Sequence, residues 1–473
     1  MVNLPTKTKI VCTLGPSTYS ENVIENMVYS GMRIARLNLS HGTLEEHAKV
    51  AETIRKISNK HSIPIGILID IPGVKYRTGL LSSGVIELIQ NESITLTSED
   101  ILGDNNIISV HPAGISKAVT PGSTILLDDG FLELSVKEID GKNIHCMVTR
   151  GGRLTENRGI AIPGYTYKEI FLTAKIKTFL KFAAEQKGDF IALSTVRSSK
   201  DITDVKKVLD KHNYSPNIIS KIERAQALDN IDAIIDESDA IMVARGDLGV
   251  DIELSRVPVV QKDLIQRCNL KGKPVITATQ MLESMIKSPV PTRAEVTDVA
   301  NAIYDGTDAI MLSGETSVGE YPVETVKIMS EVAMQAENAL RYDEILRKGE
   351  RQLEQKTDDA ISFGACRTAA QLNAKLIIAF TESGSTAMRV SKYRPKSPIM
   401  ALTTHPSVQR KLSICWGVES VVAPDIQTVE DFFRVGEAIG HNRGLKSGDL
   451  IVLVAGLPIG VKGSTNLLRV ISL

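Results

Sequence analysis

Three charged residues at the ends of two neighbouring apolar runs have the types and the spacing that phosphoryl chemistry needs. In "SKIER" (220–224), Lys221 and Glu223 stand two residues apart, so their side chains point to the same side if the run is a strand. Asp247 follows the next apolar run in the chain. Carboxylates, together with substrate oxygens and waters, typically hold Mg²⁺. A lysine beside such a site predicts phosphoryl transfer or stabilisation of an enolate, and the residues leave both open.

The stretch "LIDIPGVKYRTG" (68–79) also ends an apolar run in a carboxylate, and it places two cations in one short loop. Asp70 closes the run, a Pro–Gly pair breaks it, and Lys75 and Arg77 follow. Arginine binds phosphate oxygens in bidentate geometry, which fits the same chemistry. A single such charge is more often a solvated surface residue, but the set as a whole indicates a site. Other apolar runs end in Arg36, Asn38, Ser40 and His41, in Arg245 and Gly246, in Thr279 and Gln280, and in Ser313 and Glu315.

These residues need a fold that gathers the ends of many strands, and the alternation of apolar runs with helical periodicity supplies one. Eight strands, each followed by a helix, predict a (β/α)₈ TIM barrel rather than a doubly wound sheet. The chemistry of that fold lies at the carboxyl ends of its strands. The chain contains no phosphate-binding P-loop motif. The expected strands are 9–14, 33–39, 65–70, 190–195, 217–223, 240–244, 274–278 and 309–313.

The alternation predicts three domains. We expect the barrel over 1–74 and 169–342. Short alternating runs with Gly, Asn and Pro turns over 75–168 predict an inserted β-rich domain. A second α/β alternation predicts a C-terminal α/β domain over 343–473, with 341–357 as the linker to it.

Composition excludes several classes of protein. The chain has 473 residues, 42% of them hydrophobic, and a formal net charge of −1, which argues against a nucleic-acid or anionic-membrane binder. Five scattered cysteines without a Cys-x-x-Cys motif indicate a reduced, cytoplasmic protein. The first residues lack a signal sequence, and no apolar run is long enough to span a membrane.

Several long motifs resemble the pyruvate kinase family, and the resemblance covers essentially the whole chain. They are "RLNLSHG" (36–42), "SKIER" (220–224), "IMVARGDLGVDI" (241–252), "KPVITATQMLESM" (273–285), "PTRAEVTDVANAIYDGTDAIMLSGETSVGEYP" (291–322) and "GSTNLLRV" (463–470). The resemblance implies the same three domains, with the barrel as the catalytic A domain, the inserted domain as a lid, the B domain, and the C-terminal domain as a regulatory domain, and it implies a homotetramer. It also implies transfer of a phosphoryl group from phosphoenolpyruvate to ADP, giving pyruvate and ATP, with Mg²⁺ or Mn²⁺ as cofactor.

The resemblance assigns roles to residues at the strand ends. Glu223 and Asp247 would hold Mg²⁺, and Lys221 would stabilise the transferring phosphoryl group and the enolate. Arg36 would bind phosphate, and Thr279 is linked to protonation of the enolate. The backbone N–H groups of Arg245, Gly246 and Asp247 would bind the substrate carboxylate at a helix start. The nucleotide would meet Pro16, Asn38, His41 and Arg77, and the lid would add Asp128 and Arg158.

The resemblance also predicts a monovalent-cation pocket, and one substitution changes that prediction. Asn38, Ser40, Asp70 and the carbonyl of Ile71 match the K⁺ pocket of the family. Lys75 stands where the family has the glutamate that accompanies K⁺ dependence. An ammonium beside Asp70 would supply the charge of K⁺, and both cations together would repel each other. We therefore expect K⁺ not to be required.

The C-terminal domain contains a candidate effector site. Hydroxyls and backbone N–H groups at a helix start form a phosphate-binding loop, with a second Gly-rich segment at 456–466 beside it. A phosphorylated allosteric activator is expected there, and a loop without any effector is the alternative. The residues of the expected effector loop are Thr381, Ser383, Gly384, Ser385 and Thr386.

Two other functions are weighed against the phosphotransferase. One is a related barrel enzyme that handles phosphoenolpyruvate as an enolate-forming lyase, which the lid, Lys221 and the C-terminal domain disfavour. The other is a non-catalytic effector-binding relative, which the presence of Lys221, Glu223, Asp247 and Thr279 disfavours.

Overall fold

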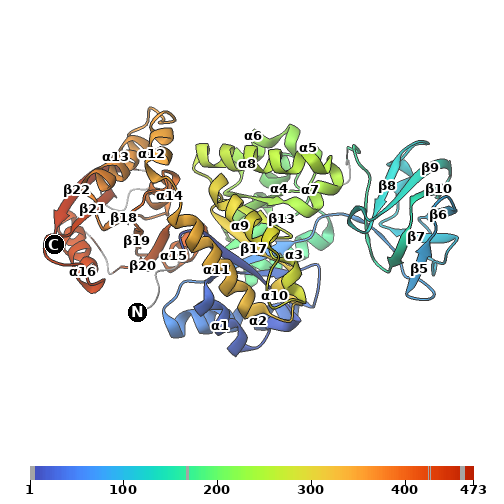
Figure 1. Ribbon diagram of the computed structural model, residues 1–473, viewed down its shortest axis with the longest axis horizontal. Coiled ribbons are helices and arrows are strands. Elements are labelled where there is room, and N and C mark those ends of the chain that lie inside the picture. The colour runs from blue at the N-terminus through green and yellow to red at the C-terminus, as the bar shows by residue number, and fades with distance from the viewer. Residues whose placement is uncertain (1–5, 167–169, 424–425, 427, 459–463) are drawn as a thin grey trace.

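Eight parallel strands close into a barrel at the centre of the molecule, and they are the apolar runs expected from the sequence (Figure 1). The computed structural model describes residues 6–166, 170–423, 426, 428–458 and 464–473. Pairing runs around the barrel in chain order, and the last strand pairs with the first. The strands are β1 (Lys9–Leu14), β2 (Met32–Asn38), β3 (Gly66–Ile71), β13 (Phe190–Leu193), β14 (Asn217–Ile222), β15 (Ala240–Ala244), β16 (Val275–Ala278) and β17 (Ala309–Leu312).

Helices cover the outside of the barrel, and local sequence signals determine where several of them begin. Thr43 and Glu46 form a capping box at the start of α2, and Thr292 and Glu295 form another at the start of α9. The buried helix faces pack on the strands in one apolar core. The helices are α1 (Glu21–Ser30), α2 (Leu44–His61), α3 (Ala174–Glu185), α4 (Ser199–Asp210), α5 (Ala225–Asp229), α6 (Ile231–Glu237), α7 (Arg245–Asp251), α8 (Val257–Lys271), α9 (Arg293–Asp305), α10 (Gly314–Ser317) and α11 (Pro322–Asn338).

The chain leaves the barrel after β3 and forms a separate β domain. Seven of its strands close into a small barrel, and β5 and β11 form a two-stranded sheet. A core of its own fills this domain, which explains why short alternating runs suffice to fold it. Its strands are β4 (Tyr76–Thr78), β5 (Val85–Leu88), β6 (Ser93–Thr97), β7 (Ile107–His111), β8 (Thr124–Leu127), β9 (Leu132–Asp140), β10 (Asn143–Arg150), β11 (Gly152–Thr155) and β12 (Gly159–Ala161).

Gly73 lets the hinge between barrel and lid pass close to β13. A Cβ atom at Gly73 would lie 2.0 Å from the Thr195 Oγ1 atom, a distance that no side chain tolerates. A glycine is therefore required there for the chain to leave the mouth of the barrel at this angle.

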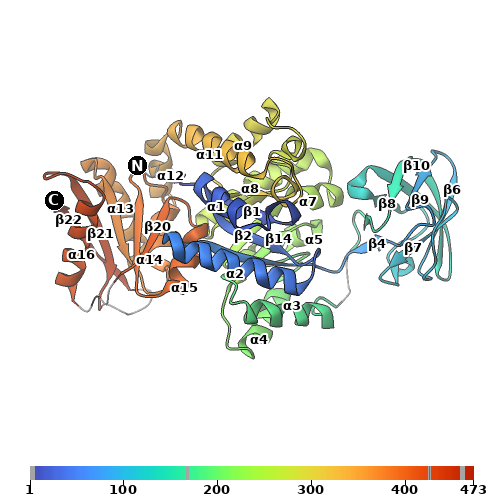
Figure 2. The same cartoon turned by 90° about the horizontal axis from the view of Figure 1, so that it is seen from below.

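The C-terminal domain is a five-stranded sheet with helices, and it lies at the opposite end of the barrel from the lid (Figures 1 and 2). The strand order is β20, β19, β18, β21, β22, and only β22 runs antiparallel. The expected linker contains a helix, α12. The strands are β18 (Leu376–Phe380), β19 (Ile399–Thr403), β20 (Val418–Val422), β21 (Leu450–Gly456) and β22 (Thr465–Ser472), and the helices are α12 (Tyr342–Glu350), α13 (Thr357–Leu372), α14 (Ser385–Lys392), α15 (Pro406–Lys411) and α16 (Val429–Asn442).

The predicted fold class is confirmed: a (β/α)₈ barrel with an inserted β-rich domain and a C-terminal α/β domain. Among the described residues, no helix combines the length and the apolar character needed to cross a membrane.

Candidate active site

The ammonium of Lys221, near the end of β14, lies in a buried cluster of opposite charges at the mouth of the barrel. Its Nζ atom is 3.3 Å from Asp70 Oδ2 and 2.9 Å from Glu223 Oε1. It also donates a hydrogen bond of 2.8 Å to Ser194 Oγ. Burial alone lowers the pKa of this ammonium, but the attraction of Asp70 and Glu223 outweighs it and raises the pKa above its usual value. Lys221 is therefore a fixed positive charge at neutral pH.

Arg36, from β2, is held by the same carboxylate. Its Nε and Nη2 atoms each lie 2.8 Å from Asp70 Oδ2, and Nη1 donates to Thr13 Oγ1 at 2.7 Å. One carboxylate thus orients two cations, Arg36 and Lys221. Two cations held rigidly at this point of the mouth offer donors suited to phosphate oxygens.

Glu223 and Asp247 lie close enough to share one cation. Glu223 is 1% exposed, and its Oε2 atom accepts the N–H of Thr195 at 3.0 Å. Its Oε1 atom is buried and accepts no hydrogen bond from the described residues, although Lys221 lies nearby. The positive charges of Lys221 and Lys75 outweigh burial and lower the pKa of the Glu223 carboxyl, so it is ionised. A buried, ionised and incompletely satisfied carboxylate fits a metal ligand.

The ammonium of Lys75 bridges these two carboxylates. It contacts Asp247 Oδ1 and lies 3.7 Å from Glu223 Oε2. Burial lowers the pKa of the Lys75 ammonium, but the attraction of both carboxylates raises it by a larger amount. The pKa of Lys75 therefore lies above its usual value. The prediction that the Lys75 ammonium lies beside Asp70 is wrong, because it pairs with Asp247 and Glu223 instead. The physical reason is charge: Asp70 is already paired with Arg36 and Lys221, whereas Glu223 is otherwise paired only with Lys221 and Asp247 has no other cation partner among the described residues.

The described residues contain no cluster of three or more His, Cys, Asp and Glu side chains arranged to hold a metal ion. The pair Glu223 and Asp247 still fits Mg²⁺, which usually takes one or two carboxylates together with substrate oxygens and waters. The bridging ammonium demonstrates that one cation reaches both carboxylates.

Gly246, in the first turn of α7 after β15, and Thr279, directly after the neighbouring strand β16, meet at the mouth of the barrel. The Gly246 N–H donates to Thr279 Oγ1 at 2.8 Å, and the Thr279 hydroxyl donates to the Ala278 carbonyl at 2.6 Å. Thr279 has a φ of 68°, a strained conformation for a β-branched residue and one that is common at functional sites. The Arg245 guanidinium is bound elsewhere, 2.7 Å from Asp298 Oδ2, so only the backbone of Arg245 is left for a substrate.

The residues expected to meet the nucleotide divide between barrel and lid. Burial and the charges of Arg77 and Arg36 lower the pKa of His41, which indicates that the three side chains are neighbours. In the lid, Arg158 Nη1 lies 3.3 Å from Asp128 Oδ1, so these two residues form a pair. Pro16 begins a short 3₁₀ helix, Pro16–Thr18, directly after β1.

The expected monovalent-cation pocket consists of polar groups that are already engaged. Asn38 Oδ1 accepts the Ser40 N–H at 3.2 Å, and the Ile71 carbonyl accepts the Ser194 N–H at 3.2 Å. Asp70 is bound by Arg36 and Lys221. These residues lie together at the ends of β2 and β3, which pair Asn38 with Asp70.

Three residues that contribute to the site were missed by the sequence analysis. Ser194 and Thr195 follow β13 and bind Lys221 and Glu223, and Thr195 has a φ of 55°. The signal was a Ser–Thr pair directly after an apolar run. Asp129 of the lid lies near Asp247, and burial together with that charge raises its pKa. Lid residues Asp129 and Gly159 line a small cavity of about 50 Å³ with Glu223 and Asp247.

The expected effector loop is at the start of α14, far from the mouth of the barrel (Figure 1). Thr381 Oγ1 accepts the Gly384 N–H at 2.9 Å, and the hydroxyls of Ser383 and Ser385 are 3.2 Å apart. Thr386 bonds Thr465 at 2.8 Å, which brings the start of β22 to this loop. Residues 459–463 of the second Gly-rich segment lie outside the described residues.

Known proteins resemble this chain over nearly its whole length. Residues 5–326 match the family described as "Pyruvate kinase, barrel domain", and residues 359–471 match "Pyruvate kinase, alpha/beta domain". A pyruvate kinase of Clostridium acetobutylicum is 41% identical over 98% of this chain and 99% of that protein. One of Staphylococcus saprophyticus is 44% identical over 98% of this chain and 80% of that protein. A crystal structure of a pyruvate kinase from Cryptosporidium parvum superposes with a TM-score of 0.92 at 38% identity, covering 99% and 96% of the two chains.

Proposed function

Because this chain belongs to the pyruvate kinase family, enzymes that transfer a phosphoryl group from phosphoenolpyruvate to ADP to give pyruvate and ATP, we propose how its own residues do so. The observation that supports the proposal is the buried cluster of Arg36, Asp70, Lys221 and Glu223 at the mouth of the barrel. It holds two cations rigidly beside a pair of carboxylates able to share a metal ion.

Lys221 and Arg36 stabilise the phosphoryl group while it transfers. The transition state spreads negative charge over the phosphoryl oxygens, and the leaving group is an enolate that is also negative. Asp70 fixes both cations before the reaction begins, so little reorganisation is needed when the charge develops. Lys221 lies 2.9 Å from Glu223 Oε1, beside the carboxylates proposed to hold the metal, which supports a role at both the phosphoryl group and the enolate.

Glu223 and Asp247 would hold Mg²⁺ or Mn²⁺, which supplies positive charge to phosphoryl and enolate oxygens when bound. The backbone N–H groups of Arg245 and Asp247 bind the substrate carboxylate at the start of α7, and the Gly246 N–H joins them by exchanging its hydrogen bond with Thr279 Oγ1 for one with the carboxylate. Thr279, in contact with Gly246, positions the proton that the methylene carbon of the enolate takes up to give pyruvate. The alternative, that an ordered water delivers this proton, uses the same hydroxyl.

ADP binds between the barrel mouth and the lid. Pro16, Asn38, His41 and Arg77 meet it from the barrel side, and the paired Asp128 and Arg158 meet it from the lid. Closing the lid excludes water, which protects the phosphoryl group from hydrolysis. Asp129 of the lid lines one small cavity with Glu223 and Asp247, which supports a lid that closes over these carboxylates.

K⁺ is not required for this reaction. Asp70 is the carboxylate of the expected K⁺ pocket, and Arg36 and Lys221 already place two positive charges against it. Lys75 is the third cation of the same mouth, and it supplies the positive charge that Glu223 and Asp247 would otherwise lack and that K⁺ would have to supply from nearby. A bound K⁺ ion would lie among like charges, which is unfavourable.

We expect the metal site to respond in opposite directions to two substitutions. Lys75→Gln removes the ammonium that competes for Glu223 and Asp247, so Mn²⁺ should bind about tenfold more tightly, a change of about 1.4 kcal/mol. Glu223→Gln removes a ligand and should weaken Mn²⁺ binding at least about tenfold. Electron paramagnetic resonance of free Mn²⁺ measures both without substrates or turnover.

Lys117→Gln, an exposed lysine of the lid, is the matched control for charge and should leave Mn²⁺ affinity unchanged. Equal affinity in Lys75→Gln and the wild type would contradict competition by the ammonium. Equal affinity in Glu223→Gln and the wild type would contradict the metal site itself.

The enzyme is a cytoplasmic homotetramer.

The C-terminal domain is a regulatory domain that binds a phosphorylated activator. The activator-binding residues are Thr381, Ser383, Gly384, Ser385 and Thr386. The free N–H groups at the start of α14 favour a phosphate. Ser385→Asp places a negative charge there and should raise the activator concentration for half-maximal effect at least about tenfold, as like charges repel. Steady-state assays with a panel of phosphorylated metabolites measure it. Ser407→Asp, at the exposed start of α15, is the control; an equal response of both variants would exclude the loop.

A further inference from the structure

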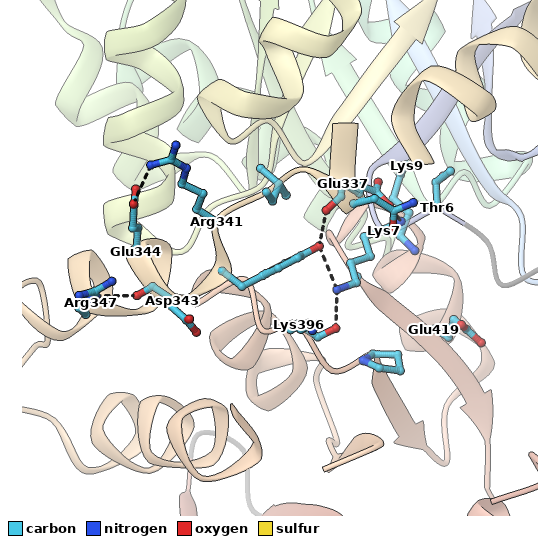
Figure 3. Close-up of a pocket in the computed structure, with 15 residues that line it drawn as sticks. Thr6, Lys7, Lys9, Glu337, Arg341, Asp343, Glu344, Arg347, Lys396 and Glu419 are labelled. Carbon is cyan, nitrogen blue, oxygen red and sulfur yellow. Dashed lines mark hydrogen bonds and ion pairs between the residues drawn. The ribbon is translucent and has the colours of Figure 1, made fainter. Parts of the chain in front are cut away.

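A pocket of about 680 Å³ lies where the barrel, α12 and the C-terminal domain meet (Figure 3). We call it the junction pocket. It shares no residue with the cluster at the barrel mouth or with the effector loop. Its size is that of a site for a small metabolite. The lining residues are Thr6, Lys7, Lys9, Glu337, Asn338, Leu340, Arg341, Tyr342, Asp343, Glu344, Arg347, Lys396, Pro398, Gly417 and Glu419.

Three of the cations that line the junction pocket have no carboxylate partner among the described residues. Lys9 Nζ donates to the Val418 carbonyl at 2.7 Å, and Arg347 Nε donates to the Asp343 carbonyl at 3.2 Å. Within the part of the chain that the structure describes, Lys9, Arg347 and Lys396 form no ion pair. They come from β1, α12 and the loop before β19, so they surround the pocket from three elements.

Three of the four carboxylates of the pocket are already bound, and only the Asp343 carboxylate has no ion-pair partner among the described residues. Glu337 accepts the backbone N–H groups of Lys7 and Thr8 at 2.9 and 2.7 Å. Glu344 pairs with Arg341 at 3.0 Å, and Glu419 pairs with Arg443, which does not line the pocket. Figure 3 shows the Arg341–Glu344 pair at one side of the pocket and Glu419 at the other. The lining therefore carries more positive than negative charge that is free to bind a ligand.

Two lysines of the pocket are buried at a cost that an anion would offset. Burial lowers the pKa of Lys7 and that of Lys9 to about 8 each. The Lys7 ammonium lies 4.4 Å from the centre of the Tyr342 ring and 5.0 Å from that of Trp416, which fixes it in place by cation–π contact. Tyr342 thus presents an aromatic wall beside a fixed positive charge.

We propose that the junction pocket is a second anion site, one that binds a small phosphorylated metabolite. Arg347 and Lys396 bind the phosphate at the open side, and Lys9 contributes charge from the buried side. Leu340, Tyr342 and Pro398 offer apolar surface for the body of the ligand. A bound phosphate would link α12 to the loop before β19 and so strengthen the attachment of the C-terminal domain to the barrel.

Thermal unfolding in inorganic phosphate, against chloride at equal ionic strength, tests the site. Every sample contains phosphoenolpyruvate and Mg²⁺ without ADP, which fill the active site, and every protein carries Ser385→Asp, which blocks the effector loop. We call this protein the background. Phosphate should raise the unfolding temperature of the background along a curve that saturates with phosphate concentration. The added pair Arg347→Gln and Lys396→Gln should weaken the apparent affinity at least about fivefold, because two charge-assisted hydrogen bonds are lost.

Lys348→Gln, on the same helix but outside the pocket, is the matched control and should behave like the background. Arg347 and Lys396 are both exposed, so their replacement leaves the core intact, and the unfolding temperature in chloride checks this. Absence of saturable stabilisation in the background would overturn the proposal. A phosphate response in the double variant equal to that of the background would also overturn it. So would a loss of apparent phosphate affinity in Lys348→Gln as large as that in the double variant. Catalytic activity is not used as the readout, so failure here leaves the proposed function untouched.

Discussion

Replacing Lys221 by methionine is expected to lower kcat at least about 10³-fold, because a fixed cation at the transferring phosphoryl group typically contributes 10³ to 10⁵ in rate. The ammonium lies between Asp70 and Glu223 and is 10% exposed, so no water or other side chain replaces it at the same place. Methionine keeps an unbranched side chain of nearly the same length and removes the ammonium, with its charge and its hydrogen bond to Ser194. A coupled assay of pyruvate formation from phosphoenolpyruvate and ADP measures the loss.

Two further variants separate a catalytic role of Lys221 from a structural one. Lys221→Arg keeps the charge and should retain more activity than Lys221→Met. Lys206→Met removes a lysine that pairs with Glu237 at 2.7 Å on the outside of the barrel, and it should leave kcat within about twofold, as surface pairs contribute little. A Lys221→Met enzyme that folds and keeps more than a tenth of the activity would contradict the assignment. Activity only of a lyase type, without ATP formation, would favour the enolate-forming alternative.

The substitution Lys75→Glu is expected to make the enzyme dependent on K⁺, whereas the wild type should work fully without it. The change removes a positive charge beside Glu223 and Asp247 and adds a negative one, so the net charge at the mouth of the barrel becomes more negative by two. Activity without K⁺ should fall at least about 100-fold, since close charge pairs at such sites contribute several kcal/mol. Added K⁺ should recover most of it. Steady-state rates in KCl and in tetramethylammonium chloride at equal ionic strength measure the effect.

Lys75→Gln is the neutral control and should lie between the wild type and Lys75→Glu in its response to K⁺. A strict K⁺ requirement of the wild type would refute the prediction outright. Loss of activity in Lys75→Glu that K⁺ does not recover would instead assign Lys75 to the lid hinge, beside Gly73, rather than to charge balance.

The barrel and its site could be read from the sequence to a large degree. The eight runs were recognisable because buried parallel strands are apolar throughout, and the polar residues directly after them had to share one edge. Lys221 and Glu223 follow from two-residue spacing on one strand, and the structure has them 2.9 Å apart. Asp70 and Arg36 lie on adjacent strands and meet for the same reason.

Other parts of the site depend on contacts that spacing does not encode. Thr195 and Thr279 are functional through backbone conformations with positive φ, which a β-branched residue adopts only when surrounding packing imposes them. The junction pocket joins residues 7, 342 and 396, which no local pattern connects. Asp129 comes near Asp247 only because the lid segment after β8 lies against α7, where both residues line one small cavity.

The sequence by itself determined which strands form the barrel, which charges end them, and the family to which those motifs point. Only the tertiary structure decided which carboxylate each cation chooses. Lys75 is five residues from Asp70, yet its ammonium binds Asp247 and Glu223. The physical reason is that an ion pair is determined by the charge still unbalanced at each point in space, and Arg36 and Lys221 had already neutralised Asp70.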